Sequence, residues 1–356
     1  MVIPFSSVHA AYRFSSFKGR PPIHQFGGVS DHPVGVTPEQ IKHVYNLPPT
    51  GGHGTIAIIG AYDDKTIEND LAIFSTQFNL PSCTSTNGCF EKRILGKSRD
   101  DSGWDMETSL DVEWAHAIAP LAKILLVEAK TPSGSNLLQA IDFARSRPGV
   151  VAISMSWGGA EFADETTLDN HFTSNNGAIT FFASAGDSGT GVSWPASSPN
   201  VVAVGGTYVV LSKDNNFHSE TAWAGSGGGI SVYESEPSFQ KEYAITRANG
   251  HRAIPDVSYN ADPRSGFSIY RSNGKSKKGW FVVGGTSAGA PQWAAIKSLG
   301  LSADANKFYA DKAAENNSNY FRDIKSGNNG NCGYYCEARK RYDYVTGLGS
   351  PLTSNF

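Results

Sequence analysis

The chain has 356 residues, of which 39% are hydrophobic and only 18% are charged, and its formal net charge is −3. No long basic or acidic block is present, so neither nucleic acid nor a membrane surface is expected as a partner. No apolar run approaches the roughly 20 residues that a membrane helix needs. These properties indicate a globular protein with a sizeable core, in one large α/β domain or two smaller ones.

The first 36 residues are polar and contain Pro21-Pro22, which predicts an extended arm rather than a core element. The amino terminus lacks a basic segment followed by a long apolar run, so no signal peptide is visible. Either a signal has been removed or export uses another route.

Beyond the arm, short apolar runs alternate with helical patterns, beginning with a helix whose cap is Thr37 and whose first helical residue is Pro38. In chain order the further elements are strand 55–60, helix 67–78, helix 107–118, strand 122–128, helix 136–146, strand 150–157, a helix near 166–175, strands 179–185 and 201–205, strand 280–283 and helix 291–299. The alternation predicts a mostly parallel sheet with helices on both faces. Residues 207–279 have weaker periodicity, and no linker or repeat divides the chain, so we expect one domain.

The four cysteines form two local pairs in turn-rich segments, Cys83 with Cys89 and Cys332 with Cys336. Two short disulfides are favoured over zinc, because no histidine follows either pair at ligand spacing and the pairs are far apart in sequence. Disulfides indicate an oxidising compartment.

The small-residue stretch from Gly284 to Pro291 lies between an apolar run and a helical pattern. With no bulk beside it, the hydroxyl of Ser287 can stand exposed at a helix amino terminus, which favours negative charge. This is a suitable place for a nucleophile. The alternative is an ordinary helix cap with turn glycines.

Glu107 and Asp111 are four residues apart, so a helix places them on one face. If that face is partly buried, the two carboxyl groups would share protons and one pKa would be raised. The alternative is a solvated acidic face, which is our interpretation of the neighbouring Glu113.

Asp187 follows a strongly apolar strand and stands between glycines. Ligands gather beyond the carboxyl ends of the strands of open parallel sheets, so Asp187 is a candidate functional residue. A turn or cap role is the alternative.

Histidines offer weaker partners for Ser287. His53-Gly54-Thr55 superficially resembles the catalytic His-Gly-Thr of subtilisins, but a strand follows it rather than a helix, so we interpret His53 as a turn residue. His116 is the only histidine near a motif.

Four motifs in register resemble the sedolisin family of serine-carboxyl peptidases, which includes the kumamolisins. They are Glu107-x-x-x-Asp111, Ser156-Trp157-Gly158, the run from Ala183 to Gly189, and the run from Gly285 to Pro291. The resemblance covers about residues 37 to 351 and implies a subtilisin-like three-layer α/β fold.

The resemblance implies a role for each motif residue. Ser287 would be the nucleophile, Glu107 the general base and acid, Asp111 its orienting partner, and Asp187 the oxyanion stabiliser. Carboxyl groups with an ordinary pKa of ~4 suit acidic conditions, and only a protonated Asp187 could donate to an oxyanion. Ser156, Trp157 and Gly158 would form the wall that pairs with an extended peptide substrate.

The segment at about 320–351 resembles the family's calcium loop, and hard oxygen ligands suit Ca²⁺. The implied ligands are the carboxylates of Asp323 and Asp343 and the carbonyl groups of Ile324, Arg339 and Arg341. The family typically has glycine at the last two carbonyl positions, so the arginines are a departure.

Two further positions depart from family patterns. Gly60 stands where some kumamolisins carry a glutamate that extends the proton relay. Ser193 stands where some relatives have an acidic specificity residue, so a preference for basic side chains is not supported.

We therefore expect residues 37–356 to be a single acid-acting endopeptidase domain. It would be monomeric and secreted, and it would act on polypeptides after removal of, or apart from, an inhibitory prodomain. The rivals are a neutral subtilisin-like or esterase-type serine hydrolase that uses His116, and a catalytically silent relative that binds peptides.

Overall fold

The structure is a computed structural model that describes residues 13–99, 101–174, 177–272, 278–300, 303–314 and 320–353. The first 12 residues of the predicted arm therefore lie outside the described part. Among the described residues, no helix is both long enough and apolar enough to cross a membrane.

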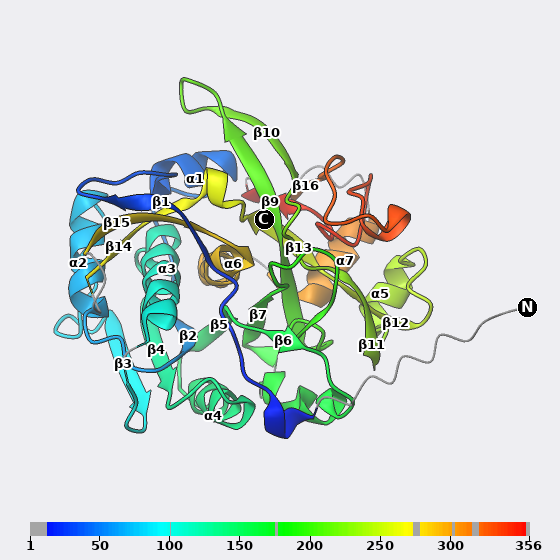
Figure 1. Cartoon of the computed structure of the whole chain (residues 1–356), viewed down its shortest axis with the longest axis horizontal. Helices are drawn as coiled ribbons and strands as arrows, with labels where there is room; N and C mark the ends of the chain where they lie inside the picture. Colours follow the sequence, from blue (N-terminus) through cyan, green and yellow to red (C-terminus); the bar gives the residue numbers. More distant parts are fainter. Residues whose placement is uncertain are drawn as a thin grey trace, which may run out of the picture.

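A mostly parallel sheet forms the middle layer (Figure 1), with strand order β10-β9-β7-β5-β2-β4-β3 and with β13 alongside β9. Only β10 is antiparallel to its neighbour. The strands are β2 (Thr55–Ala61), β3 (Phe90–Leu95), β4 (Lys123–Ala129), β5 (Val150–Met155), β7 (Thr180–Ser184), β9 (Val201–Leu211), β10 (Phe217–Ala222) and β13 (Val257–Asn260).

Helices cover both faces of this sheet. In Figure 1, α3 and α6 are drawn above the central strands and α4 below them. The helices are α1 (Pro38–Val44), α2 (Ile67–Gln77), α3 (Ser102–Ile118), α4 (Gly134–Arg145), α5 (Ser238–Tyr243), α6 (Gly289–Ser298) and α7 (Ala305–Ala314). The predicted three-layer α/β fold is confirmed.

Alternate residues of each strand face different cores, as the pleat of a strand requires. In β2, Ile56 and Ile58 join the core beneath α3 and α6. Ala57 and Ile59 join the second core, between the sheet and α4. The continuous apolar run of this strand is therefore explained by burial on both sides.

Smaller sheets surround the central one. A three-stranded antiparallel sheet has the order β1-β15-β14, and three two-stranded sheets are formed by β6 with β8, β11 with β12, and β16 with β17. Their bounds are β1 (His24–Ser30), β6 (Gly159–Ala160), β8 (Ser193–Trp194), β11 (Gly229–Ser235), β12 (His251–Ile254), β14 (Phe267–Arg271), β15 (Gly279–Gly284), β16 (Phe321–Arg322) and β17 (Ser350–Pro351). Short 3-10 turns are η1 (Phe14–Ser16), η2 (Glu165–Phe172), η4 (Pro263–Ser265), η5 (Thr286–Ala288) and η6 (Gly333–Tyr335).

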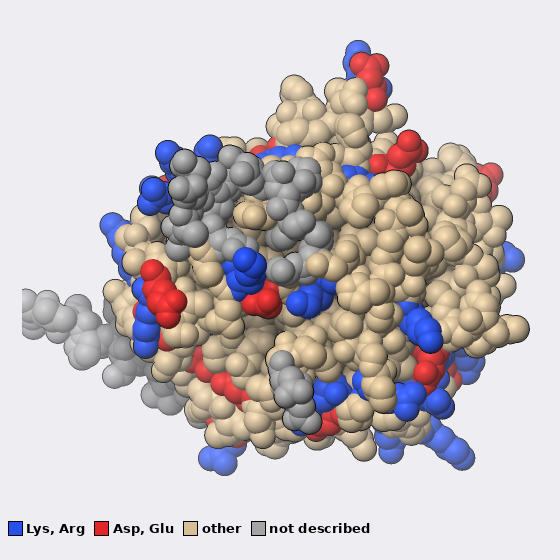
Figure 2. All heavy atoms as spheres, turned by 180° about the vertical axis from the view of Figure 1, so that it is seen from behind, with Lys and Arg blue, Asp and Glu red and all other residues tan. Residues whose placement is uncertain are grey.

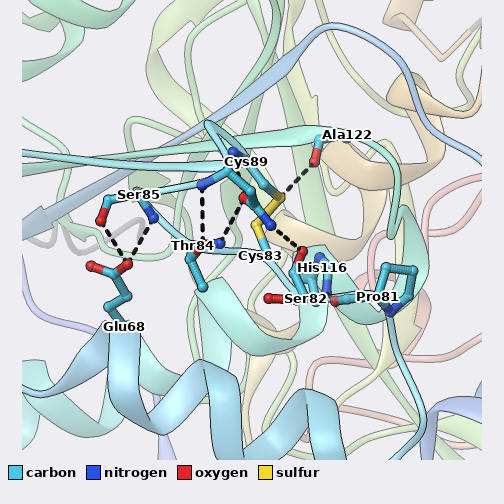
Figure 3. The surroundings of a disulfide bond; sticks show 10 residues. Glu68, Pro81, Ser82, Cys83, Thr84, Ser85, Cys89, His116 and Ala122 are labelled. Atoms are coloured by element: carbon cyan, nitrogen blue, oxygen red, sulfur yellow. Dashed lines mark hydrogen bonds between the residues drawn. A yellow bond between two sulfur atoms is a disulfide. The ribbon is translucent and has the colours of Figure 1, made fainter.

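Both predicted disulfides are present, Cys83–Cys89 and Cys332–Cys336. The first closes a polar turn after α2 (Figure 3), where Glu68 of that helix accepts hydrogen bonds from the backbone and hydroxyl of Ser85. Because the sulfurs are bonded to each other, the zinc alternative for this pair is wrong.

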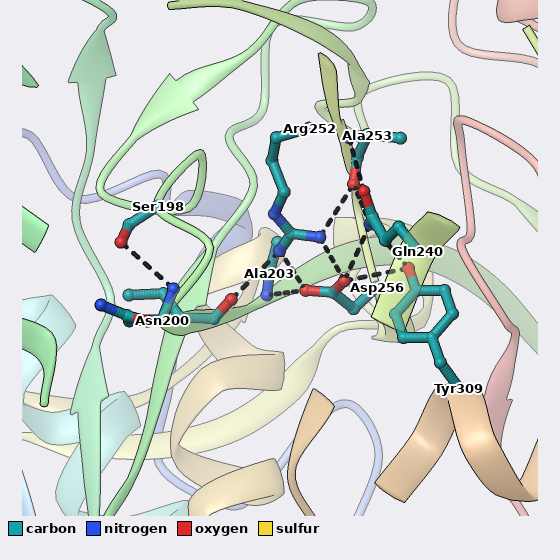
Figure 4. Close-up of polar contacts among 9 residues, drawn as sticks. Ser198, Asn200, Ala203, Gln240, Arg252, Ala253, Asp256 and Tyr309 are labelled. Atoms are coloured by element: carbon teal, nitrogen blue, oxygen red, sulfur yellow. Dashed lines mark hydrogen bonds and ion pairs between the residues drawn. The ribbon is translucent and has the colours of Figure 1, made fainter. Parts of the chain in front are cut away.

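A buried ion pair fixes the region beside β9 (Figure 4). Asp256 accepts two hydrogen bonds from Arg252, at 2.6 and 2.5 Å, and one from the backbone N–H of Ala203 at 2.8 Å. The hydroxyl of Tyr309 also donates to it, at 3.0 Å. With these partners the buried charges are compensated.

Two expectations differ from the structure. The helix expected near 166–175 is the 3-10 helix η2, which ends at Phe172. Glu113 is not on a solvated face but is fully buried, and its carboxylate accepts a hydrogen bond from the backbone N–H of Tyr270 at 3.0 Å. The residue faces β14, which covers α3, and the local pattern alone could not reveal that cover.

The face opposite the view of Figure 1 carries interspersed acidic and basic side chains among broad uncharged areas (Figure 2). This agrees with the absence of a long charged block in the sequence.

Candidate active site

The candidate catalytic residues meet beyond the carboxyl ends of two neighbouring strands. β5 and β7 are adjacent and parallel, with Met155 opposite Ala183. Ser156 directly follows β5, and Asp187 follows β7. The turn that carries Ser287 packs against this edge. Ligand sites of open parallel sheets form at this kind of edge.

Ser287 lies in η5, between β15 and α6, as the sequence predicts. Two glycines make this tight turn possible. Gly285 has φ +133°, and a β-carbon there would come 2.1 Å from the carbonyl oxygen of Pro22 and 2.5 Å from Asp187 Oδ2. A β-carbon on Gly289 would come 2.5 Å from Val204 Cγ1. Larger residues at either position would move the serine.

Glu107 and Asp111 are brought together with Ser287 by α3. The helix is capped by Asp101, whose carboxylate accepts hydrogen bonds from the first backbone N–H groups. Both acids are 2% exposed and Ser287 is 0% exposed, so the face that carries them is buried rather than solvated.

Burial and charge shift both carboxyl groups. The pKa of Glu107 is raised well above its ordinary value, first by burial and then by the charge of Asp111. The pKa of Asp111 is also raised by burial, while hydrogen bonds from Ser156 and Glu107 oppose the rise. These partners favour the charge on Asp111 and the proton on Glu107 when the pair holds one proton.

Ser156 connects the acid pair to the serine turn. Its Oγ lies 2.7 Å from Asp111 Oδ1 and 3.1 Å from the carbonyl oxygen of Ser287. The Ser287 hydroxyl, in turn, lies 3.5 Å from the carbonyl oxygen of Ser156. The predicted substrate-wall residue Ser156 therefore also holds Asp111.

Asp187 is held by the residue before the serine. Its Oδ1 accepts hydrogen bonds from the backbone N–H and the hydroxyl of Thr286, at 2.8 and 2.7 Å. The Thr286 hydroxyl accepts in turn from the N–H of Gly186 at 3.1 Å. Burial raises the pKa of Asp187, while His24 and Thr286 oppose the rise.

The two histidines weighed from the sequence lie elsewhere. His53 stands in the loop before β2, at the opposite end of the sheet from the site, which confirms the turn interpretation. His116 is buried beside the Cys83–Cys89 disulfide (Figure 3), with Nε2 2.8 Å from the carbonyl oxygen of Pro81, and burial lowers its pKa to about 4. Neither is a partner of Ser287.

Two residues of the site were not predicted. Thr286 was treated only as part of the turn, although its side chain holds Asp187. His24 was not considered, although its Nε2 lies 3.2 Å from Asp187 Oδ2. No sequence signal pointed to His24, because it belongs to a polar arm without a local pattern.

The arm itself runs through the site. The backbone of Arg20 donates to the carbonyl of Gly158 at 3.0 Å, and the N–H of Gly158 donates to the carbonyl of Arg20 at 3.1 Å. Trp157 is buried and its Nε1 donates to the carbonyl of Ile59 at 3.1 Å, which fixes this wall of the site on the sheet. Ser193 of β8 flanks the wall, near Gly158 and Gly186.

The predicted calcium residues meet in one loop. The backbone N–H of Arg339 donates to Asp343 Oδ2 at 3.0 Å, and the N–H of Arg341 donates to Asp323 Oδ1 at 2.9 Å. Arg341 adopts φ +70°, and the side chain of Ile324 is buried. The carboxylates of Asp323 and Asp343 thus both contact the turn at residues 339–341. Carboxylate oxygens are the hard ligands that Ca²⁺ prefers.

The architecture is that of the subtilisin-like α/β proteins, with the carboxyl groups of Glu107, Asp111 and Asp187 near a buried serine. The chain belongs to the subtilase family, whose model (Peptidase_S8: Subtilase family) matches residues 41–318. The prediction of a serine-type peptidase is thus confirmed at the level of the family.

Within the family, the chain is similar to sedolisin of Pseudomonas sp. (strain 101), with 30% identity over 89% of this chain and 60% of the relative. It is similar to kumamolisin of Bacillus sp. (strain MN-32), with 32% identity over 90% of this chain and 62% of the relative. The predicted resemblance is confirmed. The chain spans about three fifths of the length of these two relatives.

Solved structures agree with this family assignment. Pseudomonas sedolisin, a serine-carboxyl proteinase complexed with two molecules of pseudo-iodotyrostatin, has a TM-score of 0.75 at 28% identity, covering 92% of this chain and 96% of that one. Sphericase has a TM-score of 0.58 at 19% identity, covering 91% of this chain and 99% of that one, and shares the fold.

Proposed function

We propose that this protein is an acid-acting serine-carboxyl endopeptidase that hydrolyses polypeptides through Ser287, Glu107 and Asp111, with Asp187 at the oxyanion site. The observation that carries the proposal is the meeting of three buried carboxyl groups around a buried serine, from parts of the chain far apart in sequence. Similarity to sedolisin and kumamolisin supports it.

In the first step, the Ser287 hydroxyl attacks the substrate carbonyl and transfers its proton to Glu107, giving a tetrahedral intermediate. To accept that proton Glu107 must be ionised, which a shift of the pair's proton to Asp111 allows. Glu107 then gives the proton to the leaving amine as the C–N bond breaks, which leaves the acyl-enzyme. Water attacks this ester while Glu107 takes its proton, and Glu107 returns the proton to the Ser287 oxygen as the carboxylic acid product leaves.

The oxyanion needs a neutral or positive donor, so Asp187 must be protonated. Its Oδ1 already accepts two hydrogen bonds from Thr286. A proton on Asp187 therefore belongs on Oδ2, the oxygen beside Gly285. This directs the O–H toward the place where the oxyanion would form.

The acidic optimum follows from the sign of this titration. A raised pKa means that Asp187 keeps its proton to higher pH than an ordinary carboxyl group. Above that pKa it becomes charged and would repel an oxyanion, so activity is expected to fall as pH rises. Ionised Asp187 also raises the pKa of Glu107. Glu107 then keeps its proton to higher pH, and in that form it cannot accept the proton of Ser287.

An extended peptide fits the wall at Ser156, Trp157 and Gly158, because a backbone strand already pairs there. Main-chain pairing depends little on side-chain identity, which suits an endopeptidase.

We also propose that Asp323 and Asp343, with the carbonyl groups of Ile324, Arg339 and Arg341, hold a calcium ion. When bound, the ion would supply positive charge that ties the carboxyl-terminal loop together. The two disulfides support secretion, and we propose that the protein acts on polypeptides as a monomer.

The test is proteolysis of a denatured protein from about pH 2 to about pH 8 by the wild type, after acid incubation, and by Ser287→Ala. We expect an acidic optimum that disappears in the variant. An optimum near neutrality that is lost in His116→Ala would instead favour the histidine-dependent hydrolase. Equal peptide binding by the two proteins, with no hydrolysis by either, would favour the silent relative.

A further inference from the structure

Glu161 joins two parts of the chain that border the candidate cleft. It directly follows β6, which continues the wall that ends at Gly158. Its Oε1 accepts a hydrogen bond from the hydroxyl of Ser231, and its Oε2 accepts one from the backbone N–H of Val232 at 3.3 Å. Both partners belong to β11, about 70 residues further along the chain. A side chain next to the wall thus holds a strand from a distant part of the sequence.

The backbone around Ser231 directs the hydroxyl of this residue to Glu161. The Ser231 oxygen accepts hydrogen bonds from the backbone N–H groups of Tyr233 and Glu234, at 3.1 and 2.8 Å. A hydroxyl that accepts twice has only its proton left for a further contact. Ser231 is 2% exposed, so this proton goes to Glu161 and not to bulk water.

The segment that leads into β11 is also joined to the loop that carries Asp187. Gly228, which directly precedes β11, exchanges two backbone hydrogen bonds of 2.8 Å with Gly191. The N–H of Gly227 donates to the carbonyl of Gly186, the residue before Asp187, at 2.7 Å. The contact between the wall and β11 therefore closes a frame that runs from the wall, through β11, to the candidate oxyanion site.

A second carboxyl group, that of Glu165, lies against Glu161. Glu165 is fully buried in η2, where its Oε2 accepts a hydrogen bond from the N–H of Phe162 and its Oε1 accepts one from the hydroxyl of Ser197, both at 2.8 Å. Burial raises the pKa of Glu161, while hydrogen bonds with Ser231, the backbone of β11 and Glu165 oppose the rise. Two carboxyl groups in contact do not both ionise readily, so they share a proton.

The proton of this pair belongs on Glu165. Burial, and then the charge of Glu161, raise the pKa of Glu165 to about 8. Glu161 is only partly buried and receives two donors from β11, so it keeps the charge. A protonated Glu165 donates to Glu161 and holds it in place, whereas an ionised Glu165 repels it. Because Glu161 is the more exposed of the two, it would then turn toward solvent and release β11.

The other charged groups around Glu165 come from the elements packed against η2. Glu234 of β11 adds a negative charge that raises the pKa of Glu165 further, after burial and Glu161. Arg252 of β12 offsets part of the charge of Glu234 but is already paired with Asp256. The remaining groups are Asp169 in η2, His251 in β12, and Asp142, Arg145 and His171 at the contact of η2 with α4.

We propose that Glu161 is a positioning residue that fastens the peptide-binding wall to β11, and that a protonated Glu165 keeps this clamp closed. The clamp is the contact of Glu161 with Ser231 and Val232. The proposal rests on the proposed function, because the wall matters only if a peptide binds along it, and it adds two residues outside the catalytic set. The wall would hold the substrate main chain equally in the ground state and the transition state, so the clamp affects KM and not kcat.

The first experiment removes the carboxylate. Glu161→Ala is compared with the wild type in steady-state hydrolysis of an internally quenched peptide at the acidic optimum. We expect KM to rise about three- to tenfold, the net worth of one hydrogen bond, with kcat unchanged. The matched control is Asp164→Ala, because Asp164 is exposed in the same segment and does not cap η2 with its side chain. This control should keep the wild-type KM.

An unchanged KM in a Glu161→Ala protein that hydrolyses the peptide would overturn the clamp and leave the proposed function intact. Ser231→Ala separates the contact from a general loss of structure. Alone it should also raise KM, but combined with Glu161→Ala the rise should stay well below the product of the two single rises, because the shared contact is already lost. Independent, multiplicative effects on KM would likewise overturn the clamp.

The second experiment tests the proton on Glu165 without catalysis. Binding of the same peptide to the Ser287→Ala protein is measured by calorimetry from about pH 5 to about pH 9. The pKa of Glu165 is raised, so the clamp is closed at acid pH and opens as pH rises through about 8. Glu165→Gln keeps an N–H donor toward Glu161 at every pH, so its affinity should fall about threefold less over this range. An identical pH dependence in the two proteins would overturn the role of Glu165.

Failure of the clamp and failure of the proposed function give different results. If Glu161→Ala weakens peptide binding by the Ser287→Ala protein but the wild type hydrolyses no peptide at any pH, the peptidase function is refuted and the clamp stands as a feature of a peptide-binding protein. If the wild type hydrolyses the peptide and Glu161→Ala changes neither KM nor binding, only the clamp is refuted.

Discussion

Thr286 gives both of its hydrogen-bond donors to one oxygen of Asp187. The backbone N–H lies 2.8 Å and the hydroxyl 2.7 Å from Oδ1. This leaves Oδ2 as the oxygen on which a proton can sit and donate. The residue beside Ser287 therefore decides the direction in which the candidate oxyanion donor points.

Removing that hydroxyl should disturb the oxyanion donor while leaving the shape of the turn. Thr286→Val keeps the branched shape but loses one donor to Oδ1, so kcat should fall by about tenfold, the worth of one hydrogen bond. The Thr286 hydroxyl lowers the pKa of Asp187. Without it that pKa rises, and the alkaline limb of the kcat profile should move to higher pH.

Thr286→Ser, which keeps the hydroxyl, is the matched variant and should restore the wild-type limb. A Thr286→Val profile that is lower but unshifted would indicate a packing role only.

Ser156 should set the other limb of the profile. Its hydroxyl lowers the pKa of Asp111, so Ser156→Ala raises that pKa, and the acid limb of kcat should move to higher pH with a loss of about tenfold. Ser154→Ala is the control, since Ser154 lies on β5, the strand directly before Ser156, and its buried hydroxyl has no hydrogen-bond partner among the described residues. An acid limb that stays in place in Ser156→Ala would remove Ser156 from the set of positioning residues.

Much of the fold was predictable because its signals are local. The buried run at 55–60, the helical spacing of Glu107 and Asp111, and the glycine turn at Ser287 each depend on neighbouring residues. The course of the arm could not be predicted, because an extended polar segment gains its hydrogen bonds from distant chain, here Gly158 and Ser133. Glu113 was misassigned for the same reason, since β14 covers it from 157 residues further on.

The buried pair of Arg252 and Asp256 should dominate stability around β9. Asp256→Ala would leave a fully buried guanidinium without its carboxylate, which typically costs about 3–5 kcal/mol. We expect this loss in urea unfolding, measured in the Ser287→Ala background so that self-digestion cannot contribute. The control is Asp31→Ala, whose exposed partner is His32 and which should leave the unfolding midpoint unchanged. A midpoint in Asp256→Ala equal to that of the parent would show that the pair is not needed.

Calcium should stabilise the folded protein if the loop holds it. Binding to the native state alone adds about 2.7 kcal/mol at a hundred times the dissociation constant, so the melting temperature should rise with added calcium and fall with a chelator. Asp343→Asn should abolish this response, whereas Asp214→Asn, on an exposed turn, should keep it. A melting temperature of the wild type that is independent of calcium would refute the calcium site, whether or not the protein is active as a peptidase.

The assignment of Glu107 as base is tested most directly by one rate comparison. The second-order rate constant kcat/KM for a peptide substrate is measured at the acidic optimum for the wild type and for Glu107→Ala. Loss of a general base predicts a fall of about 10²- to 10⁴-fold with an unchanged melting profile. Wild-type turnover in the Glu107→Ala protein at acid pH would contradict the serine-carboxyl mechanism.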